Sequence, residues 1–108
     1  MEFPDNKRFA FSILDDTDDA TLENVKPVYD RLRDLGFRTT KTAWPLDCPE
    51  GSKNFFAAET LQNAAYLDFV HSLVDDGFEL AFHGATMESS RRERTLQGLE
   101  FLKSEFGS

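Results

Sequence analysis

Hydrophobic and polar positions follow two patterns that take turns along the chain. Short apolar runs at 8–14, 37–44 and 78–83 predict β-strands. Apolar side chains at helical spacing predict helices over 21–35, over 64–75, and from Ser89 or Ser90 to Phe106. Because strand and helix alternate three times, we expect an α/β fold of three βα units with a parallel sheet.

The first run, from Arg8 to Leu14, carries apolar residues on both sides of the expected strand. Such a run is typical of a strand buried in a parallel sheet. It ends in two adjacent aspartates, Asp15 and Asp16, which repel each other unless a cation, a shared proton or a metal ion relieves them.

The composition of the chain indicates a globular protein and disfavours several classes of partner. With 108 residues and 40% hydrophobic residues, we expect one globular domain over residues 1–108. A net charge of −8 disfavours nucleic acid and anionic membranes as partners. One cysteine excludes an internal disulfide, and neither a signal peptide nor a membrane span is evident, so we expect a cytoplasmic protein.

Parallel strands bring their carboxyl ends to one edge of the sheet, where α/β folds place ligands. That edge would gather the Asp15–Asp16 pair and His83, with Trp44 as a possible sugar-stacking platform. It would also receive a second group of polar side chains, namely Asp47, Glu88 and Arg91. Each has a simpler interpretation, as a solvated turn, a structural histidine, a core indole or an exposed helix face.

Two segments resemble motifs of the NodB-type polysaccharide deacetylases. The run Phe11-Ser12-Ile13-Leu14-Asp15-Asp16 is similar to the first motif of that family, and Gly77-Phe78-Glu79-Leu80-Ala81-Phe82-His83 is similar to the approach to its second motif. The resemblance spans about Phe9 to Phe106. It implies part of a distorted (β/α) barrel of the polysaccharide deacetylase type, of which this chain would supply the N-terminal portion.

The resemblance also implies roles for single residues. Asp15 would be the catalytic base, and Asp16 and His83 would hold a divalent metal, zinc or similar, in a hydrolase that removes N- or O-acetyl groups from a carbohydrate. From their expected place at the same edge of the sheet, and not from the resemblance, we expect Trp44, Asp47, Glu88 and Arg91 to contact that substrate. The family's second histidine has Met87 in its place, with Glu88 as a substitute oxygen ligand.

Other interpretations remain open. The alternative within the family is a non-catalytic carbohydrate-binding or interaction domain. A response-regulator receiver also has acids after its first strand, but it needs an aspartate where strand three ends in His83; a haloacid-dehalogenase-type phosphatase shares only the acids of its motif. Since three strands are few for a sheet covered on both faces, the chain either forms a small open sheet, associates as a homo-oligomer or lacks a C-terminal part, and we expect one of the last two.

Overall fold

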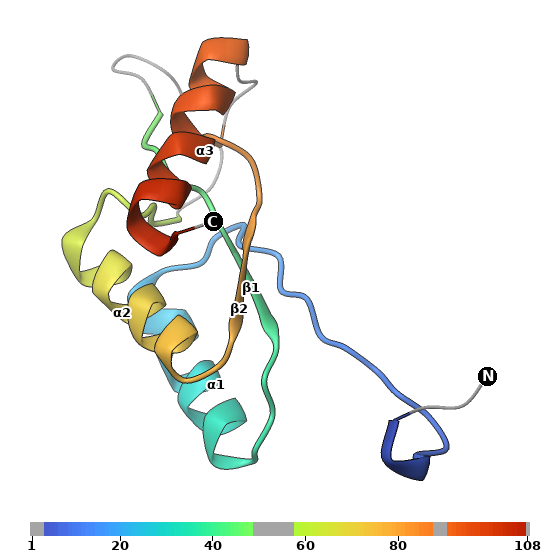
Figure 1. The fold of residues 1–108 in the computed structure, drawn as a ribbon. Helices are drawn as coiled ribbons and strands as arrows, with labels where there is room; N and C mark the ends of the chain where they lie inside the picture. Colours follow the sequence, from blue (N-terminus) through green and yellow to red (C-terminus); the bar gives the residue numbers. More distant parts are fainter. Residues whose placement is uncertain (1–3, 49–57, 88–90, 108) are drawn as a thin grey trace.

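The computed structural model of the chain describes residues 4–48, 58–87 and 91–107. The elements follow one another as η1 (Pro4–Asn6), α1 (Leu22–Asp34), β1 (Thr40–Ala43), α2 (Ala64–Asp75), β2 (Glu79–Phe82) and α3 (Arg92–Phe106) (Figure 1).

The strands form a small parallel sheet. β1 pairs with β2, with Thr40 opposite Glu79 and Ala43 opposite Phe82. On the other edge of β1, the first apolar run adds a single parallel bridge between Leu14 and Thr40. The three parallel segments therefore lie side by side in chain order, which confirms the expected α/β class and parallel sheet.

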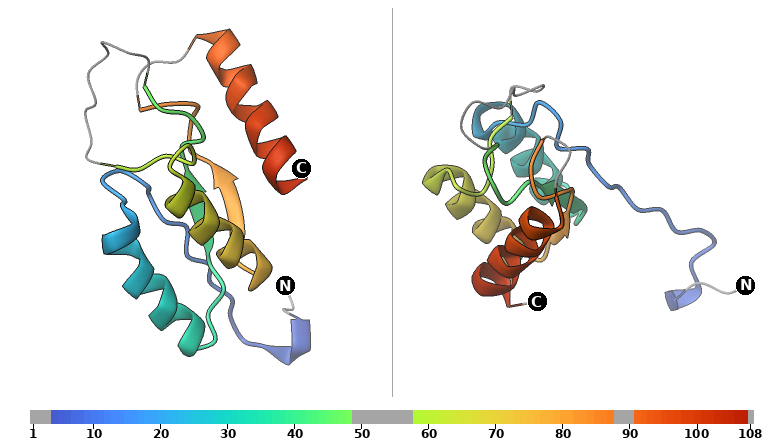
Figure 2. Two further views of the ribbon diagram at one scale, coloured as in Figure 1. Left: turned by 90° about the vertical axis from the view of Figure 1, so that its left-hand side faces the viewer. Right: turned by 90° about the horizontal axis from the view of Figure 1, so that it is seen from above.

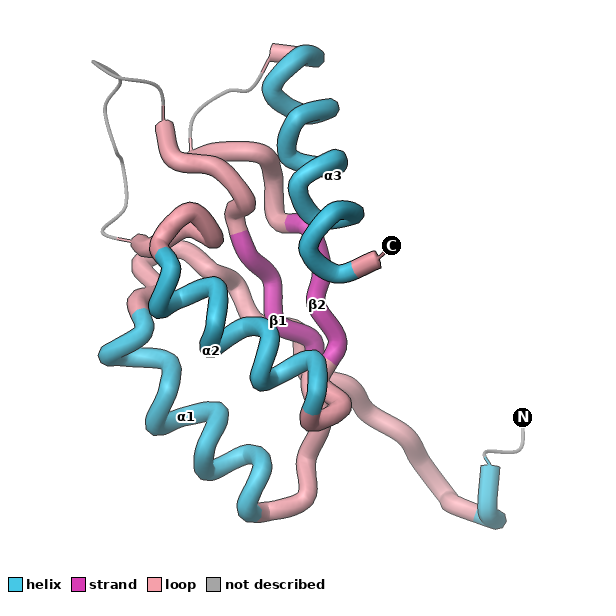
Figure 3. Tube along the Cα trace, turned by 60° about the vertical axis from the view of Figure 1, so that its left-hand side comes forward, coloured by secondary structure: helices cyan, strands magenta, loops and turns pink. Residues whose placement is uncertain are grey.

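The helices pack against one face of this sheet (Figures 2 and 3). Ala43, Leu80 and Phe82 of the strands share a core with side chains from each helix. The helical members of that core are Leu22 and Val25 of α1, Tyr66, Leu67 and Val70 of α2, and Phe101, Leu102 and Phe106 of α3. Strands in chain order joined by right-handed crossovers place their helices on the same side, as observed here.

The helix predictions are confirmed closely for α1 and α2. Thr21 caps α1 through its side chain, and Asn24 returns the hydrogen bond in a capping box. Gly36 and Gly77, which follow α1 and α2, adopt left-handed φ angles of 83° and 97°, a conformation in which glycine commonly ends a helix. The N-cap of α3 is Arg91 rather than Ser89 or Ser90, which lie outside the described residues.

The prediction of a buried first strand is wrong. Phe9, Phe11 and Leu14 are 72%, 64% and 66% exposed, and only Leu14 has a bridge to the sheet. The segment leaves the body as an extended arm (Figures 1 and 2). Its apolar side chains have no second strand beside them among the described residues, so an apolar run alone did not guarantee burial.

No helix in the described ranges is long and apolar enough to cross a membrane.

Candidate functional site

The turn after the first segment sends alternate side chains in opposite directions. Asp15 and Thr17 point toward the buried Lys41, whose ammonium lies 3.0 Å from Asp15 Oδ2 and 3.5 Å from Thr17 Oγ1. Asp16 and Asp18 point the other way, toward His83. An extended backbone alternates its side chains in this manner, so anchoring Asp15 and Thr17 leaves Asp16 and Asp18 on the accessible side.

Local hydrogen bonds hold the turn. The Asp18 backbone N–H donates to Asp16 Oδ1 at 3.1 Å, an aspartate-mediated turn that joins the two acids. The Ala20 N–H donates to the Thr17 carbonyl at 3.0 Å, and Asp19 adopts a left-handed φ of 61°. The side chain of Thr17 is fully buried beneath the turn.

His83 reaches the same place from the end of β2. Its backbone N–H donates to the Ala43 carbonyl at 3.1 Å, so the parallel pairing continues up to this residue. Its imidazole meets the indole of Trp44 edge to face, with ring centroids 5.0 Å apart and planes at 81°. The neighbouring indole restricts the ring and helps to aim Nε2 at the two aspartates.

The resulting cluster joins residues that follow the two outer segments of the described sheet, at the carboxyl end that these parallel segments share. His83 Nε2 lies 3.5 Å from Asp16 Oδ1 and 3.5 Å from Asp18 Oδ1. One ligand atom from each residue lies within 4.8 Å of the others. The expected meeting of Asp16 with His83 is therefore observed, although 67 positions separate them in the sequence. Sequence analysis missed Asp18 as a partner.

Two of the three separations in this cluster are compatible with a divalent ion. Two ligands bound at zinc-like distances on adjacent corners of a tetrahedron are roughly 3.4 Å apart. The two separations from His83 Nε2 match that spacing. The side chains of Asp16, Asp18 and His83 are 69%, 35% and 27% exposed, so solvent can reach the centre. Three protein ligands with an accessible fourth position are typical of catalytic rather than structural zinc sites.

Asp15 has a different environment from Asp16. Its Oδ2 receives hydrogen bonds from Tyr29 Oη at 2.6 Å and pairs with Lys41 Nζ, while its Oδ1 accepts from the Thr42 N–H at 2.8 Å. Burial, reinforced by the hydrogen bond to Asp15, raises the pKa of Tyr29 above its usual range, so Tyr29 donates as a neutral phenol. Asp15 thus ties the first segment to α1 and β1.

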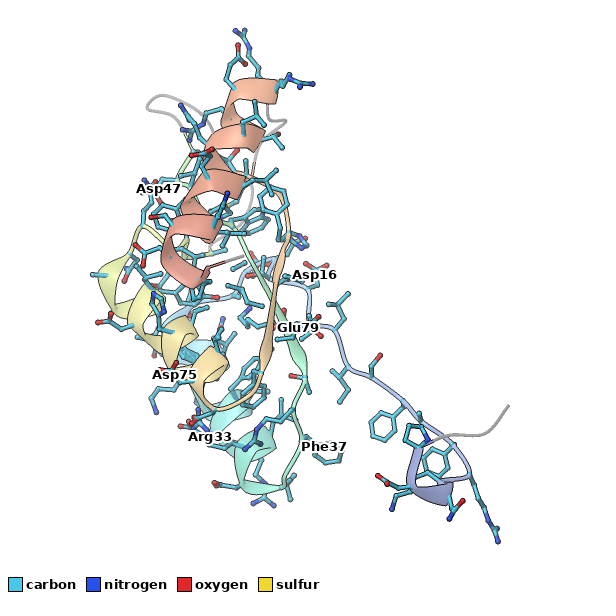
Figure 4. All side chains as sticks on the ribbon, viewed as in Figure 1. Asp16, Arg33, Phe37, Asp47, Asp75 and Glu79 are labelled. Carbon is cyan, nitrogen blue, oxygen red and sulfur yellow. The ribbon has the colours of Figure 1, made fainter. Side chains whose placement is uncertain are left out.

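The other predicted site residues lie in varied surroundings. Trp44 is only 4% exposed, so its ring contacts protein and leaves little surface for stacking on a sugar. The carboxylate of Asp47 accepts a hydrogen bond from the Thr60 hydroxyl, and in Figure 4 Asp47 lies well apart from Asp16. Arg91 is exposed ahead of α3, and Glu88 lies outside the described residues.

An apolar groove runs along α3 and contains none of the residues of the Asp16–Asp18–His83 cluster. It is lined by Leu46, Leu96, Gln97, Glu100, Phe101 and Ser104. None of the predicted site residues lines it, so the groove and the carboxylate–imidazole cluster are separate features.

Comparison with known proteins adds no assignment: no family model, curated protein or solved structure matches the chain.

Proposed function

We propose that the chain binds a divalent metal ion through Asp16, Asp18 and His83 and belongs to a hydrolase that removes acetyl groups from a carbohydrate. The observation that carries the proposal is the convergence of His83 Nε2 on two carboxylates at 3.5 Å, although His83 and the carboxylates follow the two outer segments of the described sheet. Two nearby carboxylates repel each other, and a cation between them relieves that repulsion.

The resemblance to the deacetylase motifs supplies the type of reaction. The parallel βα units, with helices on one face, agree with the opening part of a (β/α) barrel. In that interpretation, Asp18 provides the third ligand that Met87 cannot provide, because a thioether is a poor partner for zinc-like ions beside oxygen donors.

The residues of the site would divide the work. A divalent ion at this place would polarise an acyl carbonyl and lower the pKa of an attacking water. Asp16, Asp18 and His83 would hold the ion, and Trp44 would hold the His83 ring in position. Asp15 would accept the proton of the attacking water, which requires its side chain to give up its present partners and turn from Lys41 toward the side of Asp16.

A second candidate is a non-catalytic carbohydrate-binding domain with the same ion site. It is favoured by the full engagement of the Asp15 carboxylate with Tyr29, Lys41 and Thr42, which leaves the base poorly placed to accept a proton. The hydrolase and the non-catalytic domain would bind the same ion, but only the hydrolase would release acetate.

Calorimetric titration with Zn²⁺ or Co²⁺ tests the ion. We expect saturable binding that weakens at least about tenfold in Asp16→Asn, Asp18→Asn and His83→Gln, because each substitution removes one ligand. Matched controls are His71→Gln, which changes a histidine paired with Glu105, and Asp68→Asn, which removes an exposed charge from α2. Equal binding by ligand variants and controls would refute the site.

Acetate release then separates the candidates. With Zn²⁺ or Co²⁺ bound, we expect release from oligomers of N-acetylglucosamine, and its loss in Asp16→Asn. Ion binding without any release would overturn the hydrolase and leave the non-catalytic domain. Absence of ion binding would overturn both.

A further inference from the structure

The arm formed by residues 7–16 has a backbone edge to which no strand pairs among the residues that the structure describes. Thr40 donates to the Ile13 carbonyl and accepts from the Asp15 N–H, so residues 13 and 15 direct their backbone groups toward β1. In an extended chain the next residues direct theirs the opposite way, which aims the N–H and C=O of Ser12 and Leu14 at the open side. An unpaired edge of this kind is a template for another strand.

The arm is also apolar and accessible. Phe9, Phe11 and Leu14 are each more than half exposed, and Ile13 is 41% exposed. Phe11 has a ring neighbour in Phe37, with centroids 6.0 Å apart, so the apolar surface continues onto the body. Contiguous exposed apolar surface beside a free edge favours a protein partner over solvent.

The order of charges along the arm indicates which strand fits. Lys7 and Arg8 stand at one end, apolar residues and Ser12 fill the middle, and the exposed carboxylate of Asp16 stands at the other end, because Asp15 is already paired with Lys41. An antiparallel second copy centred on Ser12 places outward-facing residues opposite each other and sets Arg8 of each arm against Asp16 of the other. A parallel second copy would set like charges together, which is unfavourable on neighbouring strands.

We propose that two copies of this chain associate through residues 7–16 of their arms, paired antiparallel across a two-fold axis. The contact is isologous, since each arm offers the same surface to its partner. It joins the two parallel sheets into one larger sheet and covers the exposed phenylalanines. The association does not depend on the proposed reaction, but it uses Asp16, which is also a proposed ion ligand, so it is measured without added metal.

Sedimentation equilibrium of the full chain tests this association. We expect a monomer–dimer equilibrium that weakens with added salt, because exposed charges are screened. Ser12→Pro should weaken the dimer, since it removes an outward N–H, while Ser12→Ala should not. The double variant Lys7→Glu/Arg8→Glu should weaken it about tenfold or more, and Lys7→Arg/Arg8→Lys should preserve it.

Disulfide trapping tests the direction of pairing. In a Cys48→Ser background, Ser12→Cys should cross-link two copies, because residue 12 lies near the two-fold axis. Phe9→Cys should not, since antiparallel pairing places the two copies of residue 9 about 13 Å or more apart. A monomer at every concentration, a dimer unaffected by Ser12→Pro and charge reversal, or efficient cross-linking at residue 9 would each overturn the proposal.

Discussion

Lys41 is the residue whose environment differs most from what its type suggests. Its side chain is 1% exposed on β1, and its ammonium contacts the Asp15 carboxylate at 3.0 Å and the Thr42 carbonyl at 2.8 Å. A buried ammonium persists only where charge and hydrogen bonds compensate its loss of water. The pair therefore secures the turn that carries Asp16 and Asp18.

Replacing this ammonium should be costly. We expect Lys41→Met to lower the free energy of unfolding by about 3 kcal/mol, because it strands the largely buried Asp15 carboxylate without its cation. Urea denaturation followed by circular dichroism measures the change. Adding Asp15→Asn to the same variant should recover part of the loss, and an unchanged midpoint in Lys41→Met would show that the pair contributes nothing.

Sequence reasoning found some of these residues and not others. The sequence shows that Asp15 and Asp16 are adjacent. It does not show that Asp15 is buried against the body while Asp16 faces His83, because this difference depends on Lys41 and Tyr29, which approach from other elements. Lys41 stands among threonines, and nothing in its neighbours separates a buried lysine from a solvated one. Asp18 was missed because its role depends on the conformation of a turn rather than on spacing.

At the scale of elements, local signals predicted helices better than strands. The apolar stripe at helical spacing predicted α2 at Ala64–Asp75, because this signal acts within a few residues. The strands proved shorter than predicted, four residues each in β1 and β2. Whether a strand is buried depends on elements that are distant in the sequence and pack against it. The apolar run at 9–14 is exposed, so its composition alone did not predict its burial.

The packing of α3 leads to a prediction at Gly98. A Cβ added there would lie 3.0 Å from Pro45 Cγ and 3.3 Å from Ala85 Cβ, so this glycine allows the helix to approach the loops that follow the strands. We expect Gly98→Ala to destabilise the protein by about 1 kcal/mol, because overpacking outweighs the gain in helix propensity. Thermal unfolding measures it, with Ser104→Ala on the exposed side of α3 as the control. A stabilised Gly98→Ala would contradict the tight contact.

At the scale of the whole molecule, the helices cover only one face of the sheet, and the first segment forms an exposed edge. The helices cover a single face, and the extended arm gives the molecule its long dimension, 53 Å against 30 and 24 Å. The acidic net charge of −8 should keep copies apart except where opposite charges meet. The arm, with its basic start and acidic end, is such a place.

The bridge between Leu14 and Thr40 holds the first segment against β1. A single peptide bond separates Asp15, whose backbone is held in this way, from Asp16, a ligand of the proposed ion. When the segment detaches, the amides of Asp15 and Thr42 lose their acceptors and become open to hydrogen–deuterium exchange. An ion that binds only the closed form should slow that exchange about a hundredfold at a concentration 100 times its dissociation constant. Amides within α2, such as that of Val70, should exchange at the same rate with and without the ion. Residue-resolved exchange measured by NMR would then show that the ion holds the first segment against β1. Equal rates with and without the ion at Asp15 and Thr42 would show that the two events are uncoupled.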